Sequence, residues 1–355
     1  MANMASGIPV YYRENAYEKL NTYLAENKAS KIFILVDSNT HNFCLTPFLT
    51  KLTTEIPLEV IEMEAGESNK NLETCSQIWN VLSELGADRK SLILNLGGGV
   101  VTDLGGFVAS CFKRGIPYIN IPTTLLGMVD ASVGGKTGVD LGNLKNQIGV
   151  INNSQMVLVD SVFLKSLPAN EMRSGLAEIL KHGLIQDEKY WNKLSALSTL
   201  NLEDLDEIIE ESVNIKAEIV SRDPEEKNLR KTLNYGHTLG HAIESYFLTH
   251  PSKSKLLHGE AVAIGMILAT FISSELKEFP RKKMQQITQT ILDMYGKVEF
   301  EVQDVKEIMD LMKYDKKNEF GKINFVLLKD IGKPLIDCLV PNEVIHKAFD
   351  FYGKA

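Results

Sequence analysis

The sequence predicts an α/β N-terminal domain with a parallel sheet, followed by an all-α C-terminal domain. In the first 160 residues, short runs rich in β-branched residues alternate with runs whose apolar residues recur every three or four positions. From about Leu164 onwards the helical spacing dominates. A chain of 355 residues is also long enough for two domains. We therefore expect domains at residues 1–163 and 164–355, with Pro168 starting the first helix of the second.

Five segments of the N-terminal half have the composition of buried strands. They are 31–37 (KIFILVD), 58–63 (LEVIEM), 91–96 (SLILNL), 118–122 (YINIP) and 155–160 (QMVLVD). Helical spacing fills the intervals, as in ETCSQIWNVLSELG, and this alternation is typical of a parallel, Rossmann-like sheet covered by helices. The C-terminal half carries the helical pattern in 170–185 (NEMRSGLAEILKHGLI) and 202–220 (LEDLDEIIEESVNIKAEIV).

Composition excludes several classes of partner. The formal charge of −8, without a long basic stripe, argues against binding to nucleic acid. The most apolar window, GEAVAIGMILATFI, is shorter than the roughly 20 residues that span a bilayer, so we expect a buried core helix and no membrane segment. The first residues do not resemble a secretory signal, and four scattered cysteines are typical of reduced thiols. We expect a cytoplasmic protein.

A run of three glycines, Gly97 to Gly99, joins the predicted strand 91–96 to a helical segment. Such a turn lets backbone N–H groups approach a ligand closely, and the following helix offers its positive N-terminal end to a phosphate. The G-x-G-x-x-G pattern is not met, because Thr102 stands where the third glycine belongs. Alone, the run is better explained by a tight strand-to-helix connection.

Polar residues also follow other predicted strands, and the ends of parallel strands meet at one edge of a sheet, where ligands bind. Asp37 could accept hydrogen bonds from ribose hydroxyls, although an aspartate at this position is more often a helix cap. The remaining residues at such ends are Glu67, Lys70, Thr123 and Thr124. Together with the glycine run, they predict a dinucleotide site.

The segment 127–149 contains six glycines and predicts a long loop whose backbone can wrap around a ligand. Lysine and arginine in such a loop favour binding of a phosphate or carboxylate; a solvated surface loop is the alternative. The charged and polar residues in and around the segment are Arg114, Asp130, Lys136, Lys145 and Asn146.

A set of glutamate and histidine residues in the C-terminal half predicts a metal site. Glu178 lies on an apolar helical segment, His237 and His241 are four residues apart, and His258 precedes the most apolar helix. One glutamate with two or three histidines fits a catalytic zinc centre that leaves a position open for water or substrate. Spacing alone indicates His237 and His241 as the chelating pair. A single histidine of this kind is more often a hydrogen-bonded core residue, and only the set as a whole favours a metal site.

Four motifs, in this order, resemble the 3-dehydroquinate synthase family of the shikimate pathway. They are PTTLLGMVDASVGGKTGVD, SGLAEILKHGLI, R-x-x-LNYGHTLGHAIE and HGEAVAIGM. The resemblance runs from about residue 30 to residue 335. It implies an NAD-binding α/β domain, a helical metal- and substrate-binding domain, a divalent metal ion (Zn²⁺, with Co²⁺ possible in its place) and a homodimer.

The resemblance also implies roles for individual residues. The metal ligands are then Glu178, His237 and His258, with His241 on the substrate side. The implied substrate-binding residues are Arg114, Lys136, Lys145, Asn146, Lys181, Lys216, Arg230, Asn234, His241 and Lys316 (or its neighbour Lys317). The catalytic residues are Asp130, Lys136, Asn146, Lys181, Arg230, Asn234 and His241. The NAD contacts are Asp37, Asn39, Glu67, Lys70, Gly98, Gly99, Val100, Asp103, Thr123, Thr124, Asp130, Lys136, Lys145, Phe163 and Ser166.

The implied reaction converts 3-deoxy-D-arabino-heptulosonate 7-phosphate to 3-dehydroquinate and phosphate, the second step of chorismate and aromatic amino acid biosynthesis. NAD oxidises carbon 5 transiently, phosphate leaves by β-elimination, the hydride returns, and the opened ring closes by an intramolecular aldol reaction. Lys136 and Arg114 are implied to hold the phosphate. A related sugar phosphate cyclase and a polyol dehydrogenase of the glycerol dehydrogenase type are the alternatives, and a non-catalytic NAD-binding module is a third.

Overall fold

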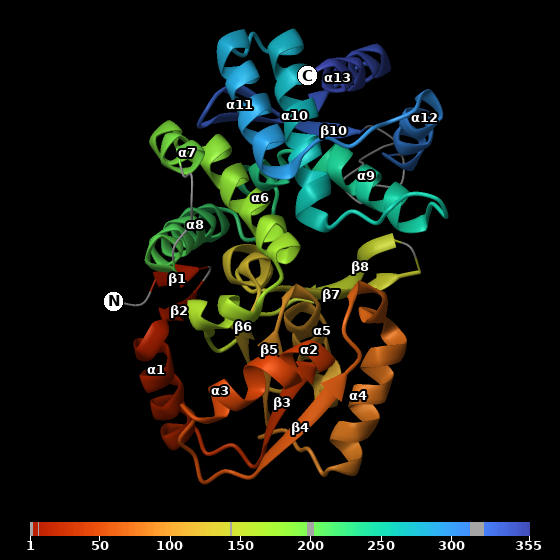
Figure 1. Ribbon diagram of the computed structural model, residues 1–355. Coiled ribbons are helices and arrows are strands. Elements are labelled where there is room, and N and C mark those ends of the chain that lie inside the picture. The colour runs from red at the N-terminus through yellow and green to blue at the C-terminus, as the bar shows by residue number, and fades with distance from the viewer. Residues whose placement is uncertain (1–2, 6, 143, 197–201, 313–322) are drawn as a thin grey trace. The chain divides into compact units, whose positions relative to one another are not determined.

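The computed structural model describes residues 3–5, 7–142, 144–196, 202–312 and 323–355 (Figure 1). The chain divides into two compact units. Unit 1 comprises Met1–Pro168 and Leu202–Ser221, and unit 2 comprises Ala169–Asn201 and Arg222–Ala355. Unit 1 is therefore discontinuous in the sequence, because it includes a helix from the C-terminal half.

Unit 1 is built on a seven-stranded sheet with the strand order β1-β2-β9-β6-β5-β3-β4. Its strands are β1 (Asn3–Ala5), β2 (Ile8–Tyr12), β3 (Ile32–Asp37), β4 (Leu58–Met63), β5 (Leu92–Gly97), β6 (Tyr118–Pro122) and β9 (Val157–Val159). Among the described residues, β1 alone pairs antiparallel in this sheet, and the other strand pairings are parallel. The predicted parallel sheet and its five predicted strands are thus confirmed, whereas β1 and β2 were not predicted.

Helices supply much of the core of unit 1. They are α1 (Arg13–Glu26), α2 (Ser38–Thr40), α3 (Thr46–Leu49), α4 (Leu72–Glu84), α5 (Gly99–Cys111) and α8 (Leu202–Arg222). Helix α5 lies against β3, β5 and β6, and α1 lies against β2 and β9. Buried side chains of the sheet, such as Phe33 and Ile93, pack with Leu104 and Val108 of α5.

The glycine-rich segment that was expected to be a loop is partly a hairpin, and that prediction is wrong for residues 136–141 and 144–149. Strands β7 (Lys136–Leu141) and β8 (Leu144–Ile151) pair antiparallel. The glycines serve this pairing, because a Cβ atom at Gly138 would lie 2.4 Å from the carbonyl oxygen of Ile148. Val139 of β7 joins the core beside α5.

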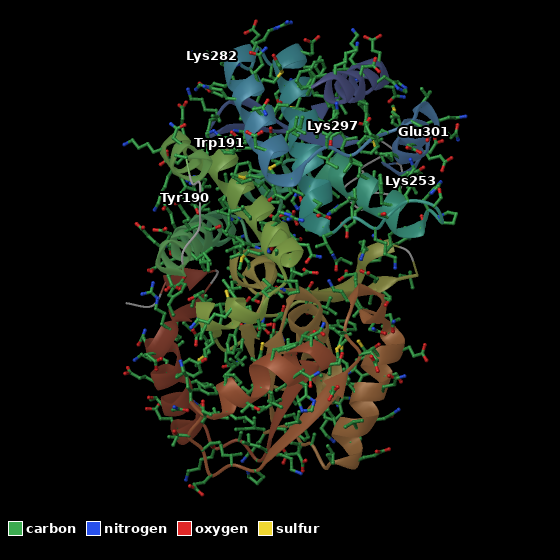
Figure 2. The ribbon with its side chains drawn as sticks, in the orientation of Figure 1. Tyr190, Trp191, Lys253, Lys282, Lys297 and Glu301 are labelled. Carbon is green, nitrogen blue, oxygen red and sulfur yellow. The ribbon has the colours of Figure 1, made fainter. Side chains whose placement is uncertain are left out.

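Unit 2 is largely helical, as predicted, and adds a two-stranded antiparallel sheet. Its helices are α6 (Ala169–Gln186), α7 (Glu188–Ser195), α9 (His237–Thr249), α10 (His258–Leu276), α11 (Arg281–Tyr295), α12 (Val302–Leu311) and α13 (Asn342–Lys354). The sheet consists of β10 (Asn324–Asp330) and β11 (Lys333–Leu339). Helix α7 buries Tyr190 and Trp191, which are labelled in Figure 2.

Helix α10 is the central element of unit 2 and contacts α6, α9, α11, α13 and β10. Among the described residues it is also the one helix whose length and composition would suffice to cross a membrane, but 72% of that window is buried. Burial of this extent is typical of a core helix, which the sequence predicted here. Two glycines of α10 allow the close packing. A Cβ atom at Gly259 would lie 2.0 Å from the carbonyl oxygen of Ser174, and a Cβ atom at Gly265 would lie 2.0 Å from the carbonyl oxygen of Gly236.

Candidate functional site

Three helices of unit 2 bring Glu178, His237 and His258 together. Glu178 lies in the middle of α6 and is fully buried, whereas His237 and His258 are the first residues of α9 and α10. Oε1 of Glu178 lies 3.3 Å from Nε2 of His237 and 3.6 Å from Nε2 of His258. The set that the resemblance implies as metal ligands is therefore a spatial cluster.

The orientation of the two imidazoles suits metal binding. The Nδ1–H of His237 can donate to the Tyr235 carbonyl oxygen at 3.1 Å, and that of His258 to the Glu244 carboxylate at 2.9 Å. In this orientation the Nε2 atoms of both rings face Oε1 of Glu178. Oε1 of Glu178 is buried and receives no hydrogen bond from the described residues. A buried carboxylate oxygen beside two imidazole nitrogens fits a divalent cation.

Lys181, one helical turn after Glu178, forms an ion pair with its other carboxylate oxygen, and both side chains are buried. Burial alone would raise the pKa of the Glu178 carboxyl, but the charges of Lys181 and His237 outweigh it and lower the pKa well below its usual range. Burial would lower the pKa of His258, yet the Glu244 and Glu178 carboxylates raise it to about 10. Glu178 is therefore ionised within the cluster.

His241 lies close enough to belong to the same cluster. Its ring centroid is 5.1 Å from that of His237 and 5.7 Å from that of His258. One ligand atom from each of the three histidines lies within 4.8 Å of the others. A three-histidine set is thus geometrically possible, but the buried oxygen of Glu178 then lacks a partner, and we favour the set containing Glu178 for this reason.

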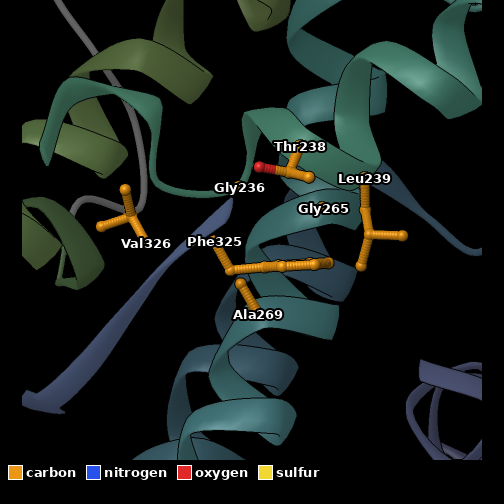
Figure 3. Close-up of a pocket in the computed structure, with 7 residues that line it drawn as sticks. All are labelled: Gly236, Thr238, Leu239, Gly265, Ala269, Phe325 and Val326. Carbon is orange, nitrogen blue, oxygen red and sulfur yellow. The ribbon is translucent and has the colours of Figure 1, made fainter. Parts of the chain in front are cut away.

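The first turn of α9 is held by close packing against α10 and β10. Figure 3 shows the small space beneath this turn, which does not admit a water molecule. It is lined by Gly236, Thr238, Leu239, Gly265, Ala269, Phe325 and Val326. Thr238 also donates to the Asn324 carbonyl oxygen at 3.2 Å. The packing around His237 therefore leaves its backbone little freedom to move.

Two further predicted substrate residues lie just before α9, on the 3₁₀ segment Leu229–Asn234. The Arg230 guanidinium is buried and donates to the Pro224 carbonyl oxygen at 2.9 Å. Asn234 donates to Glu226 at 2.9 Å. The remaining prediction in this half, Lys316 or Lys317, lies outside the described residues.

In unit 1 the glycine run and the predicted residues after β6 are neighbours. Helix α5 begins at Gly99, and the Thr123 N–H donates to the Gly97 carbonyl oxygen at 3.0 Å. A Cβ atom at Gly98 would lie 2.8 Å from the Thr124 methyl group. Val100 and Asp103 follow in the first turns of α5. The structure thus brings these predicted NAD contacts to one edge of the sheet.

A buried lysine links the predicted NAD residues to the hairpin. Lys70 donates to Asp103 Oδ2 at 2.6 Å and to Asn146 Oδ1 at 2.7 Å, and Lys145 donates to Glu67 at 2.8 Å. Burial would lower the pKa of Lys70, but the Asp103 and Glu67 carboxylates outweigh it and raise the pKa. Burial raises the pKa of Asp103 even with Lys70 beside it. Lys70 therefore remains a cation.

Asp140, which the sequence analysis did not select, organises this network. Its Oδ1 accepts from the Asn146 N–H at 2.7 Å, its Oδ2 lies 3.3 Å from Lys145 Nζ, and its N–H donates to the Lys70 carbonyl oxygen at 2.9 Å. Asn146 has the left-handed φ of 51° that few non-glycine residues adopt. In the sequence, Asp140 is visible only as an aspartate five residues before Lys145. This spacing predicts no contact unless the hairpin is known.

The other predicted NAD contacts lie on short helices after β3 and β9. Asp37 caps α2 by accepting from the Thr40 N–H at 2.8 Å, so one of its oxygens has the role that aspartate most often has at such a position. Asn39 is exposed on the same short helix. Phe163 is buried, and Ser166 donates to its carbonyl oxygen at 3.1 Å.

The remaining predicted residues of unit 1 do not all converge. Lys216 of α8 donates to the Asp130 carboxylate and carbonyl oxygens, both at 2.5 Å. Lys136 begins β7 at the open end of the hairpin, whereas Asn146 lies near its turn. Arg114 follows the C-terminal end of α5, roughly 20 Å along the helix axis from Gly99. Arg114 is therefore not brought to the glycine run within this chain.

Comparison with known proteins places these features in a family. Residues 60–174 match the family model for the 3-dehydroquinate synthase N-terminal domain, and residues 175–318 match that for the C-terminal domain. The 3-dehydroquinate synthase of Parabacteroides distasonis is 43% identical over 339 residues, which cover 95% of each chain.

Solved structures share the fold. A 2-epi-5-epi-valiolone synthase from Streptomyces hygroscopicus with NAD⁺ and Zn²⁺ bound is 25% identical, covers 98% of this chain and 97% of its own, and has a TM-score of 0.84. A 2-deoxy-scyllo-inosose synthase complexed with carbaglucose-6-phosphate, NAD⁺ and Co²⁺ is 23% identical, covers 98% of each chain and has a TM-score of 0.85. With both domain models matched in order and a relative similar over nearly its whole length, the chain belongs to the 3-dehydroquinate synthase family.

Proposed function

We propose that the chain is a carbon–oxygen lyase that converts 3-deoxy-D-arabino-heptulosonate 7-phosphate to 3-dehydroquinate and phosphate. The observation that carries the proposal is the convergence of Glu178, His237 and His258 in a member of this family. We further propose a cytoplasmic homodimer, with NAD bound by residues 1–163 and metal and substrate by residues 164–355. Membership of the family supports each of these statements.

The metal ion would be held by Glu178, His237 and His258, and the buried, unsatisfied oxygen of Glu178 supports this assignment. When bound, the ion supplies a Lewis acid that makes a substrate hydroxyl easier to deprotonate near neutral pH. Zinc and cobalt both suit this donor set, and the two solved relatives contain one or the other. Lys181 neutralises the second oxygen of Glu178 and keeps the carboxylate fixed in position.

NAD would be bound at the edge of the unit 1 sheet. The backbone N–H groups of Gly98 and Gly99 and the N-terminal end of α5 suit a pyrophosphate. The cofactor supplies a hydride acceptor and donor. Lys70, held by Asp103, fixes Asn146, and Glu67 fixes Lys145, so that both hairpin residues are ordered before a ligand arrives.

The cationic residues would bind the anionic substrate. Lys136 and Arg114 are proposed for the phosphate, with help from Asn146 and His241, whereas Arg230, Lys145 and Lys216 are proposed for the carboxylate and the ring hydroxyls. Arg114 lies far from the glycine run of its own chain, so its assignment is the first to test by substitution. Arg230, buried and fixed by a backbone carbonyl, is pre-ordered for a carboxylate.

The test is release of phosphate from 3-deoxy-D-arabino-heptulosonate 7-phosphate with NAD supplied in catalytic amount and the absorbance at 340 nm followed in parallel. We expect many phosphates released per NAD, no accumulation of NADH, loss of activity on chelation and recovery with zinc or cobalt. Steady accumulation of NADH with a polyol would instead identify a dehydrogenase. Neither signal from folded, metal-loaded protein would indicate a cyclase with another substrate.

A further inference from the structure

Glu244 occupies a defined position beside the metal cluster. It lies on α9 seven residues after His237, which places the two side chains two turns apart on the same face of the helix. Its Oε2 lies 2.9 Å from Nδ1 of His258, the first residue of α10. Both side chains are largely buried, with 13% of Glu244 and 26% of His258 exposed.

We propose that Glu244 is a positioning residue of the metal centre, which orients His258 and supplies the negative charge that draws a divalent cation to it. This inference rests on the proposed metal site. The Nδ1–H of His258 donates to Glu244, so the ring is held in the orientation that places its Nε2 3.6 Å from Oε1 of Glu178. A carboxylate acting on a ligating histidine in this way also makes the ligating nitrogen more basic.

The charges in the cluster give Glu244 a second effect. Glu178 and Lys181 are ion-paired and contribute no net charge together. The carboxylate of Glu244 adds one negative charge beside this neutral pair. Without it, a divalent cation would enter a largely buried site that holds a fixed ammonium group and one fewer negative charge, at a considerable electrostatic cost.

The position of His258 in the fold makes this support more necessary than at His237. His258 begins a helix of 19 residues, and the positive end of the helix dipole reduces the basicity of an imidazole there. The carboxylate of Glu244 opposes that effect. His237 also begins a helix, but its Nδ1 faces only the partial charge of a carbonyl oxygen, that of Tyr235, at 3.1 Å. Removal of Glu244 should therefore act mainly through His258.

The experiment measures the zinc affinity of metal-free protein by competition with a chromophoric chelator. Glu244→Ala removes both the acceptor and the charge, and we expect zinc to bind roughly 10- to 100-fold more weakly. Glu244→Gln keeps an acceptor for Nδ1–H and should show a smaller loss. The matched control is Glu260→Gln. Glu260 also lies in the first turn of α10, but its carboxylate accepts from the Leu257 N–H at 2.8 Å. The zinc affinity of this variant should remain within about twofold of that of the wild type.

The outcomes separate this inference from the proposed function. If wild-type protein fails to bind one zinc ion per chain, the proposed metal centre itself is wrong. If wild type binds zinc and Glu244→Ala binds it equally tightly, only the role of Glu244 is overturned. Circular dichroism of the metal-free variants checks folding. Should Glu244→Ala not fold, Glu244→Gln decides, and wild-type affinity in that variant, which lacks the charge, would overturn the electrostatic role.

Discussion

Replacing Glu178 by glutamine should destabilise unit 2 even when no metal is bound. The side chains of Glu178 and Lys181 are 0% and 1% exposed, so the substitution leaves a buried ammonium group facing a neutral amide. Removing one partner of a buried ion pair costs about 3–5 kcal/mol. For a folding unit of this size, that loss corresponds to a fall in Tm of roughly 10 °C. Thermal denaturation of the metal-free protein at neutral pH, followed by circular dichroism, measures it.

The double variant Glu178→Gln/Lys181→Met is the control, because it removes the unpaired cation as well. Replacing both members of a buried pair by uncharged groups of similar size is often nearly neutral, so most of the lost stability should return. Zinc binding and activity should stay low in both variants, since each lacks the carboxylate. If the single variant melts at the wild-type temperature, or if the double variant is no more stable than the single one, the stabilising role of the ion pair is refuted.

Three further predictions follow from contacts outside the metal cluster. Asp140→Asn removes the charge beside Lys145, so the KM for NAD should rise about 3- to 10-fold with little change in kcat. An unchanged KM in steady-state assays would argue that the contacts of Asp140 do not order the NAD site. Gly265→Ala should lower the free energy of unfolding, measured with a denaturant, by about 3 kcal/mol, because the added methyl group would displace the first turn of α9. The same displacement should weaken zinc binding. Wild-type stability together with wild-type zinc affinity would contradict the packing argument. Burial would raise the pKa of Asp304, but hydrogen bonds from Lys253 and Tyr246 outweigh burial and lower the pKa. The ionised carboxylate therefore stabilises the fold above its unfolded pKa of about 3.9. This stabilisation is lost as the pH falls through the lower pKa of the folded state. Lys253→Met should therefore reduce the fall in Tm between about pH 4 and pH 2, and a fall as steep as in wild type would exclude the pair as its cause.

The elements that could be predicted from the sequence are those whose own residues show whether the element is buried. In strand β3, residues 32–36 form a continuous apolar run because all five are buried, and such a run is visible without a structure. Helix α10 is predictable for the same reason. By contrast, β8 leaves Leu144 and Ile151 exposed, and the glycines of the two hairpin strands hide the alternating pattern of a strand, so the hairpin was expected to be a loop.

Some residues of the candidate site could likewise be predicted from the sequence, and others could not. Glu178, His237 and His258 could be selected because their side chains are unusual in apolar helical surroundings, although spacing alone indicated His241 in place of a carboxylate. Asp140 and Glu244 could not be selected, because an acidic residue on a hairpin or a helix is ordinary until its neighbours are known. Their roles arise from contacts with residues that are distant in the sequence, and no local pattern records such contacts.

The ion pair of Glu178 and Lys181 also affects the order of events in the life of the protein. In small zinc domains the ligands repel one another until the ion arrives, and the apo chain is unfolded. Here the ammonium group already occupies one side of the carboxylate, so the newly made chain can complete unit 2 before it meets any metal. An ion bound by Glu178, His237 and His258 would then enter a finished site and could leave it again without unfolding the chain. Occupancy of such a site would follow the concentration of free divalent metal in the cell.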